Sequence, residues 1–277
     1  MSDPILDKID PQLEYFLTRL REPQPLSDNE IHDFRVLCKQ LRAYLQFYRG
    51  ERSPEQIKSL DLQVRHLAQC FVSSRDGTVL AQNLIKLAGV DIEQQAALRP
   101  LIEKYQQQSA ITAPAMSEVA SKLQELRTSW WASLACDHDG FMLNGTLNCY
   151  KRARQLANKA IESREDEAYH LWRKWAKYWL YQLRFGMTTE TKLSKKYLSK
   201  LNKLGNQLGE FNDDCVLEKA LLEHQAELTP DIYALLIEKI SGRKKKAKRQ
   251  FRSEAELLFG KAGKKMKVSG ILINKQH

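Results

Sequence analysis

The stretch that decides the fold is "AYHLWRKWAKYWLYQLRF", residues 168–185. Its tryptophans recur at intervals of three and four residues, and its histidine, arginine and lysine residues recur at the same intervals between them. Because an α-helix turns by about 100° per residue, this period places the two sets on opposite sides of one helix. We therefore predict a helix whose tryptophans lie in a protein core and whose row of positive charge faces away from that core.

The rest of the chain repeats this helical period. Only 12 glycines and 8 prolines interrupt 277 residues, and 43% of the residues are hydrophobic, which is enough for a substantial core. Ser27 and Glu30 form a capping box at one helix start, and Ser53 and Thr229 each precede a proline at a first helical position. We predict an all-α fold with helices at about 11–21, 28–49, 54–72, 77–88, 92–108, 115–133, 141–163, 165–186, 189–208, 213–226, 230–241 and 243–259.

The stretch "EIHDFRVLCKQLRAYLQFY", residues 30–48, repeats the charge pattern of residues 168–185. Each stretch has a histidine, an arginine three residues later and a lysine seven residues later. An aspartate follows each histidine, Asp76 after 44 residues and Asp213 after 43. The matching cationic residues are His32, Arg35 and Lys39 in the first stretch and His170, Arg173 and Lys177 in the second.

This repeat predicts a helical chain built from two halves. We expect a single domain over residues 10–260, with a first half at about 10–137 and a second at about 138–260. Residues 261–277 read as a basic C-terminal tail.

The cationic residues of each stretch fall on one side of its predicted helix. The arc is about 80° wide in the first stretch, which adds Arg42, and about 100° wide in the second, which adds Lys174 and Arg184. Like charges one turn apart cost a few tenths of a kcal/mol per pair, and a bound anion removes that cost. Arginine binds phosphate through its planar fork, lysine acts as a point charge, and histidine becomes more protonated beside a polyanion. A solvated helix face is the alternative, and the repetition of the pattern favours a binding surface.

Two further basic segments accompany the rows. One is "YKRARQLANKA" at 150–160, with Lys151 and Arg154, and the other is "RKKKAKRQFR" at 243–252, with Lys248 and Arg252. Lysine plus arginine outnumber aspartate plus glutamate by 44 to 34, which gives a formal charge of +10 and favours an anionic partner. The 243–252 run fits either a shared groove or a nonspecific basic segment that contacts nucleic acid or a membrane surface.

The two repeated aspartates have two interpretations. Asp76 and Asp213 fall where we expect helices to begin, and a short acceptor side chain at that position is typical of an N-cap. Alternatively, each carboxylate orients a histidine or arginine of the basic row.

With these motifs in this order, the sequence resembles the conserved histidine α-helical domain, known as CHAD, over residues 10–260. The matching segments are "IHDFRVLCKQLR", "SRDGTVL", "YKRARQLANKA", "YHLWRKWAKYWLY" and "LGNQLGEFNDDCVL". The second half departs from the first because "FNDD" stands where the first half has "SRDG", so Arg75 has no counterpart.

The resemblance implies a helical bundle built from two pseudo-twofold-related halves around a basic central cleft. It also implies that this cleft binds inorganic polyphosphate and that the protein associates with polyphosphate granules. We expect binding without cleavage, so a binding module rather than an enzyme. The expected binding residues are His32, Arg35, Lys39, Arg42, Lys151, Arg154, His170, Arg173, Lys174, Lys177, Lys248 and Arg252.

Two other functions stay open. Net charge and the 243–252 run favour a nucleic-acid binder, although the aromatic residues fall on the apolar sides of their helices, where bases cannot stack. The doublets His32-Asp33 and His138-Asp139 weakly suggest a metal-dependent phosphohydrolase, which needs several fixed ligands.

Cysteine usage and hydropathy argue against several other classes of protein. The five cysteines are odd in number and contain no CxxC pair, which argues against a disulfide framework and a structural zinc site. We expect neither a metal nor another cofactor. The N-terminal residues lack the pattern of a signal peptide, and no apolar stretch reaches membrane-spanning length, so we expect a cytoplasmic protein without a membrane partner.

Overall fold

The computed structural model describes residues 3–110, 115–134, 141–186 and 192–260. Within these residues the chain forms a helical bundle without a β-strand, so the all-α prediction is confirmed. Its helices are α1 (Pro4–Arg21), α2 (Asp28–Tyr44), η1 (Leu45–Tyr48), α3 (Pro54–Gln69), α4 (Val72–Ala88), α5 (Ile92–Ala110), α6 (Met116–Leu134), α7 (Phe141–Ser163), α8 (Asp166–Gly186), α9 (Lys192–Glu223), η2 (Gln225–Glu227) and α10 (Pro230–Phe259).

The predicted helix starts at α2 and α3 are correct. Ser27 accepts a hydrogen bond from the Glu30 amide while the Glu30 carboxylate accepts one from the Ser27 amide, which completes the capping box. Ser53 and Gln56 make the same reciprocal pair before α3. The start of α1 lies earlier than predicted, at Pro4, because the Asp3 carboxylate accepts hydrogen bonds from the first turn.

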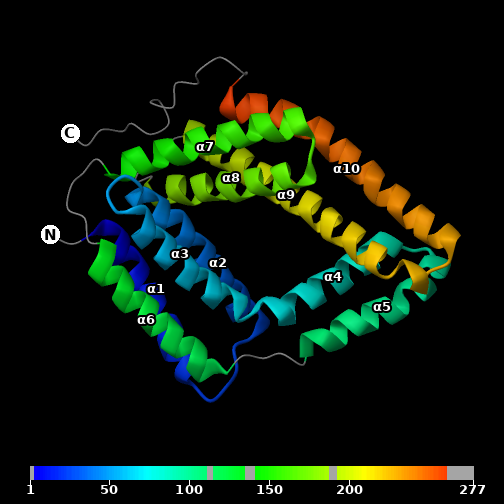
Figure 1. Ribbon diagram of the computed structural model, residues 1–277, viewed down its shortest axis with the longest axis horizontal. Helices are drawn as coiled ribbons and strands as arrows, with labels where there is room; N and C mark the ends of the chain where they lie inside the picture. The colour runs from blue at the N-terminus through cyan, green and yellow to red at the C-terminus, as the bar shows by residue number, and fades with distance from the viewer. Residues whose placement is uncertain (1–2, 111–114, 135–140, 187–191, 261–277) are drawn as a thin grey trace.

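The helices pack as neighbouring pairs (Figure 1). In the N-terminal part, α1 packs on α6, and α3 lies between α6 and α2. In the C-terminal part, α7 packs on α8, α8 packs on α9, and α9 packs on α10. Helix α10 also packs on α7. The α4–α5 pair extends to the other end of the molecule, where it packs on α9 and α10, and α2 packs on α8 (Figure 1).

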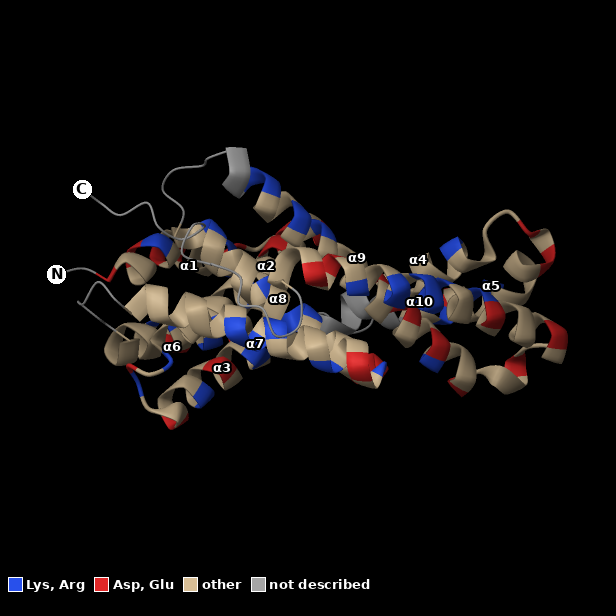
Figure 2. Cartoon of the chain, turned by 90° about the horizontal axis from the view of Figure 1, so that it is seen from above, with Lys and Arg blue, Asp and Glu red and all other residues tan. Residues whose placement is uncertain are grey.

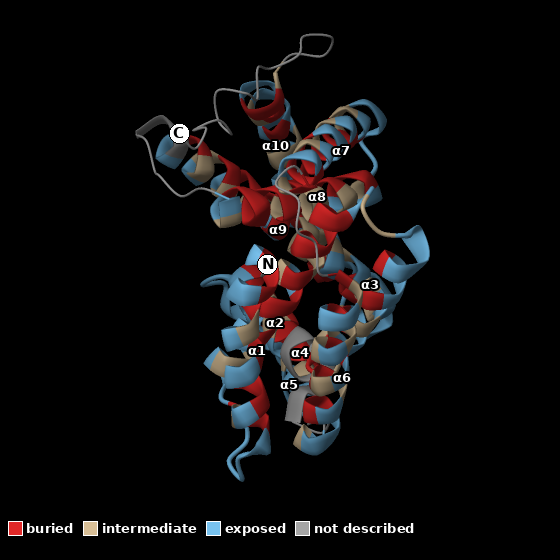
Figure 3. Ribbon diagram, turned by 90° about the vertical axis from the view of Figure 1, so that its left-hand side faces the viewer, coloured by how far each residue is buried: buried red, intermediate tan, exposed pale blue. Residues whose placement is uncertain are grey.

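Burial of aromatic side chains explains why α8 occupies the centre of its layer. Trp172 and Trp179 are fully buried, and their rings contact those of Phe251 and Phe259 from α10. Such large aromatic contacts dominate core energetics. Figure 3 shows buried residues concentrated on α8, as the tryptophan period predicts. Trp175 differs, because it is only half-buried.

Two helix breaks expected from the sequence are absent. Residues 192–223 form one helix, α9, and residues 230–259 form one helix, α10. The gaps between the predicted helices contain Gly209 and Gly242, but a glycine inside a helix costs only about 1 kcal/mol relative to alanine. Buried neighbours such as Phe211 and Ile240 outweigh that cost.

The N-capping interpretation of the two aspartates is wrong, because both residues lie inside helices. Asp213 lies inside the continuous helix α9, and Asp76 is the fifth residue of α4, which begins at Val72. The expected junction of the halves at 137–138 and the tail at 261–277 lie outside the described residues.

Candidate functional site

The cationic row of α8 is held by the side chains of α9. His170 Nδ1 lies 2.6 Å from Asn212 Oδ1, and Lys177 Nζ donates to Asn206 Oδ1 at 3.0 Å. Both partners are neutral amides. The contacts therefore fix the direction of the two side chains without bringing a carboxylate that would neutralise the row.

Two glycines on α9 make room for the row. A Cβ atom at Gly205 would lie 2.7 Å from Lys177 Cε, which is closer than real Cβ contacts allow. A Cβ atom at Gly209 would lie 3.4 Å from Arg173 Nε. The Arg173 Nε is buried and has no hydrogen-bond partner among the described residues, so this guanidinium keeps an unused donor.

Charge within the row is poorly compensated. Burial lowers the pKa of Lys177 to about 8, and the positive charges of Arg173 and Arg184 contribute to the shift. Burial raises the pKa of the half-buried Asp213, against the opposing effect of Arg173 and Lys86. Burial, together with the positive charges of the row, thus disfavours the ammonium form of Lys177.

The α2 row is more mixed. His32 and Lys39 are exposed, whereas Arg35 is half-buried and donates from Nη1 to the Phe71 carbonyl at 2.8 Å. Arg42 donates from Nε to Asp61 Oδ1 at 2.8 Å. The charge of Arg42 is therefore paired within the protein, and the exposed part of this row ends near Lys39.

The two rows extend away from one crossing. Gln182 Nε2 on α8 donates to the Ala43 carbonyl at the end of α2, at 2.9 Å. Ala43 lies 11 residues after His32, and Gln182 lies 12 residues after His170, so the helices meet at nearly equivalent positions. Figure 1 shows α8 crossing the C-terminal part of α2. Each row therefore runs from the same crossing towards the N-terminus of its helix.

Lys174 does not share the environment of the other α8 cations. It is half-buried on the flank that faces α2 and α3, with Arg42, Asp61 and Arg65 as its charged neighbours. Burial lowers the pKa of Lys174, and the charge of Arg42 is the next largest cause. The cations of the single arc on the helical wheel thus face two different helices. His170 and Lys177 contact α9, whereas Lys174 faces α3.

The remaining predicted residues lie on α7 and α10. Lys151 is exposed and Arg154 half-buried on α7, while Arg252 is exposed on α10. Lys248 Nζ lies 2.8 Å from Asp166 Oδ1 and also donates to the Arg164 carbonyl at 2.7 Å. Figure 2 shows lysine and arginine grouped along α7, α8 and α10.

Lys248 and Arg252 line a hollow of about 640 Å³ at the junction of α7, α8 and α10. Its acidic side chains are Asp166 and Glu218, which both bind the buried Lys244 at 2.5 Å. This hollow is therefore partly neutralised, unlike the α8 row.

Several residues of the site were not singled out from the sequence. Asn206, Asn212, Gly205 and Gly209 all lie in "LGNQLGEFNDDCVL" on α9. The available signal was a helical stretch with glycines four residues apart and asparagines nearby. Glycine allows another helix's side chains to approach closely, and asparagine offers a neutral hydrogen-bond partner.

Within the described ranges, no three His, Cys, Asp or Glu side chains group in a way that would hold a metal ion. His138 and Asp139 lie outside those ranges. None of the described helices combines the length and hydrophobicity needed to cross a membrane.

The fold and site define a class of all-α proteins in which two related helices carry histidine, arginine and lysine rows. The model of the CHAD domain matches residues 11–222, so the chain belongs to the CHAD family. No curated protein and no solved structure matches the chain.

Proposed function

We propose that the protein binds inorganic polyphosphate along the α8 and α2 rows and does not cleave it. The CHAD family is linked to polyphosphate binding. The observation that carries the proposal is the pairing of the α8 row with neutral amides, since Asn206 and Asn212 orient Lys177 and His170 but leave their charge available. A long, evenly charged anion fits such a row better than a compact one.

We further propose that the two halves are related by a pseudo-twofold axis and that their rows line one basic cleft. The crossing of α2 and α8 at equivalent positions supports this relation, because a twofold contact joins the same patch of both partners. The order of the helices along the chain supports this relation as well. In that order α1 corresponds to α7 and α2 to α8, while the pair α3 and α4 corresponds to α9 and the pair α5 and α6 to α10.

The groups that the row contains support binding without cleavage. Phosphoanhydride hydrolysis is usually assisted by divalent ions, which carboxylates hold. In the α8 row the groups that contact the cations are amides and glycines. We propose polyphosphate granules in the cytoplasm as the place where this binding operates.

Calorimetric titration with medium-chain polyphosphate at two salt concentrations tests the function. Wild-type protein should bind tightly, and a His170→Ala, Arg173→Ala, Lys177→Ala variant should lose most of the affinity. Binding should weaken steeply with salt, because a bound polyanion releases its counterions. Equal affinity in the triple variant, or salt-independent binding, would contradict the proposal.

Two matched controls separate the alternatives. RNA at the same phosphate concentration should fail to displace polyphosphate, whereas displacement at equal charge would favour a nucleic-acid binder. Orthophosphate release in the presence of Mg²⁺ or Mn²⁺ would overturn the non-catalytic assignment. The variant Lys219→Ala removes an exposed charge of α9 that lies outside the row and should leave binding unchanged.

A further inference from the structure

A second basic pocket lies on the opposite flank of α8, between α3, α8 and the segment that follows α2. Its volume is about 350 Å³. This lies near the lower end of the range of about 300–1,000 Å³ that is typical of small-molecule sites. The pocket is thus matched to a compact ligand rather than to a long chain.

The pocket carries a large excess of positive charge. Five of its lining side chains are lysine or arginine, and its single carboxylate belongs to Asp61. Both oxygens of that carboxylate are occupied, Oδ1 by Arg42 at 2.8 Å and Oδ2 by Arg65 at 2.7 Å. The single carboxylate is therefore shared by two arginines. The charges of Lys58 and Lys174 add to the excess of positive charge in the pocket.

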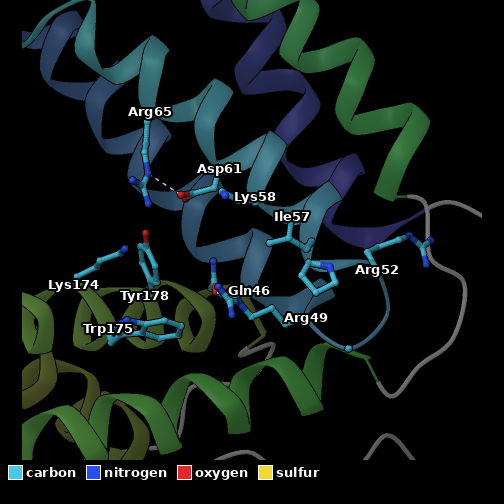
Figure 4. A pocket seen from close by; sticks show the side chains of 12 residues that line it. Gln46, Arg49, Arg52, Ile57, Lys58, Asp61, Arg65, Lys174, Trp175 and Tyr178 are labelled. Atoms are coloured by element: carbon cyan, nitrogen blue, oxygen red, sulfur yellow. Dashed lines mark hydrogen bonds and ion pairs between the residues drawn. The ribbon is translucent and has the colours of Figure 1, made fainter.

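Its floor is aromatic. Figure 4 shows Trp175 at the base of the pocket with Arg49 above it, and the guanidinium carbon lies 5.7 Å from the indole ring. The Tyr178 hydroxyl is buried and has no hydrogen-bond partner among the described residues. In Figure 4 this hydroxyl points towards Arg65 and Asp61. It is therefore a hydrogen-bond donor for a ligand oxygen that lies beside Arg65.

We propose that this pocket is a second anion site, which binds a compact oligophosphate through Arg49, Lys58, Arg65 and Lys174. Two sources carry that chemistry, a short inorganic chain and the triphosphate of a nucleotide. Phosphate oxygens suit the forked donors of the two arginines and the point charges of the two lysines. In the nucleotide case the base would stack on Trp175, and the Arg49 guanidinium would move from that ring to the phosphates.

The site is separate from the part of the α8 row that contacts α9 and that carries the proposed function. Lys174 is the member of the α8 arc that turns to this flank, whereas Lys177 and His170 contact α9. A variant of one site therefore leaves the other intact, and the two proposals can fail independently.

The test is calorimetric titration of the full chain with tripolyphosphate, without added metal. A Lys58→Ala, Arg65→Ala variant removes two exposed cations of α3, and Asp61 keeps Arg42 as its partner. We expect tripolyphosphate binding to weaken about tenfold or more in this variant. It should be unchanged in an Arg173→Ala, Lys177→Ala variant and in the charge-matched control Arg99→Ala, Lys219→Ala. Loss in the row variant alone, equal binding by all variants, or no binding by wild type would overturn the proposal.

The source is resolved by a parallel titration with adenosine triphosphate. Tighter binding than tripolyphosphate, with the difference lost in Trp175→Leu, identifies a nucleotide. Equal affinity of the two probes, both weakened in the α3 variant, identifies a short inorganic chain. If adenosine triphosphate and tripolyphosphate both ignore the α3 variant, the pocket is not an anion site.

Discussion

Lys177 should take up a proton when polyphosphate occupies the α8 row. In the free protein, burial and the charges of Arg173 and Arg184 lower its pKa to about 8. A polyanion beside Nζ stabilises the ammonium and moves the pKa back towards the ordinary value of about 10.4 for lysine. With a pKa near 8, the deprotonated fraction is about 0.1 at pH 7, about 0.5 at pH 8 and about 0.9 at pH 9. Proton uptake by this lysine on binding should follow the same fractions.

The uptake is measured by titrating polyphosphate in buffers of different ionisation enthalpy at each pH. The slope of the observed enthalpy against the buffer enthalpy gives the number of protons taken up per binding event. An ordinary imidazole is almost wholly neutral by pH 9, whereas uptake by Lys177 should rise from pH 7 to pH 9. Uptake at pH 9 therefore isolates the lysine.

The matched control is Lys177→Arg, which keeps the positive charge but stays protonated throughout this range. Uptake at pH 9 should disappear in this variant while polyphosphate binding persists. Uptake that falls steadily between pH 7 and pH 9, or that is the same in Lys177→Arg, would refute the placement of the ligand beside Lys177.

Four further variants follow from the contacts and the burial of residues on α8 and α9. The pKa of Lys177 is lower in the folded protein, so the unfolded chain binds more protons between about pH 8 and 10.4, and the free energy of unfolding should rise with pH across that range. Lys177→Met should remove that rise. It should also increase Tm, by about 2–4 °C for each kcal/mol of stability gained. Gly205→Ala should displace the Lys177 side chain and weaken polyphosphate binding severalfold, yet calorimetric Tm should stay level or rise, since alanine favours the helix by about 1 kcal/mol. Asn206→Asp should weaken binding about tenfold at low salt, measured against an Asn206→Ser control, because a carboxylate would pair with the ammonium. Trp172→Ala should cost about 3–5 kcal/mol in denaturant unfolding, as a fully buried core residue, and an exposed surface position would show almost no change.

Hydrophobic period was sufficient to predict the helices and the buried side of α8. Trp172 and Trp179 are buried as the spacing predicted, because a three- and four-residue repeat leaves one side of a helix apolar whatever packs on it. Helix ends were harder to predict. The sequence around Gly209 and Asp213 has the composition of a break, yet burial of Phe211 keeps α9 continuous.

The cationic residues could be listed from the sequence, but their partners could not. On the helical wheel Lys174 and Lys177 are only about 60° apart, so the wheel places them on one surface. Which flank each one faces depends on the packing of α3 and α9 on α8, which no local pattern encodes. For the same reason Asn206 and Asn212, which decide the electrostatics of the row, were visible only as part of a motif.

The kind of partner that holds each cation separates structural charges from those available to a ligand. Lys244 is bound by two carboxylates, and burial lowers its pKa less than those hydrogen bonds raise it, so its charge is satisfied within the fold. Arg42 is likewise paired with Asp61. Lys177 has an amide as its hydrogen-bond partner, and burial and the charges of Arg173 and Arg184 lower its pKa without a carboxylate hydrogen bond that would raise it. A helix that orients its cations through asparagine and glycine is less stable than one that pairs them with aspartate, and the difference in free energy is recovered when an external anion binds. That coupling is why substitutions that stabilise the α8 row should also be the ones that weaken its affinity for polyphosphate.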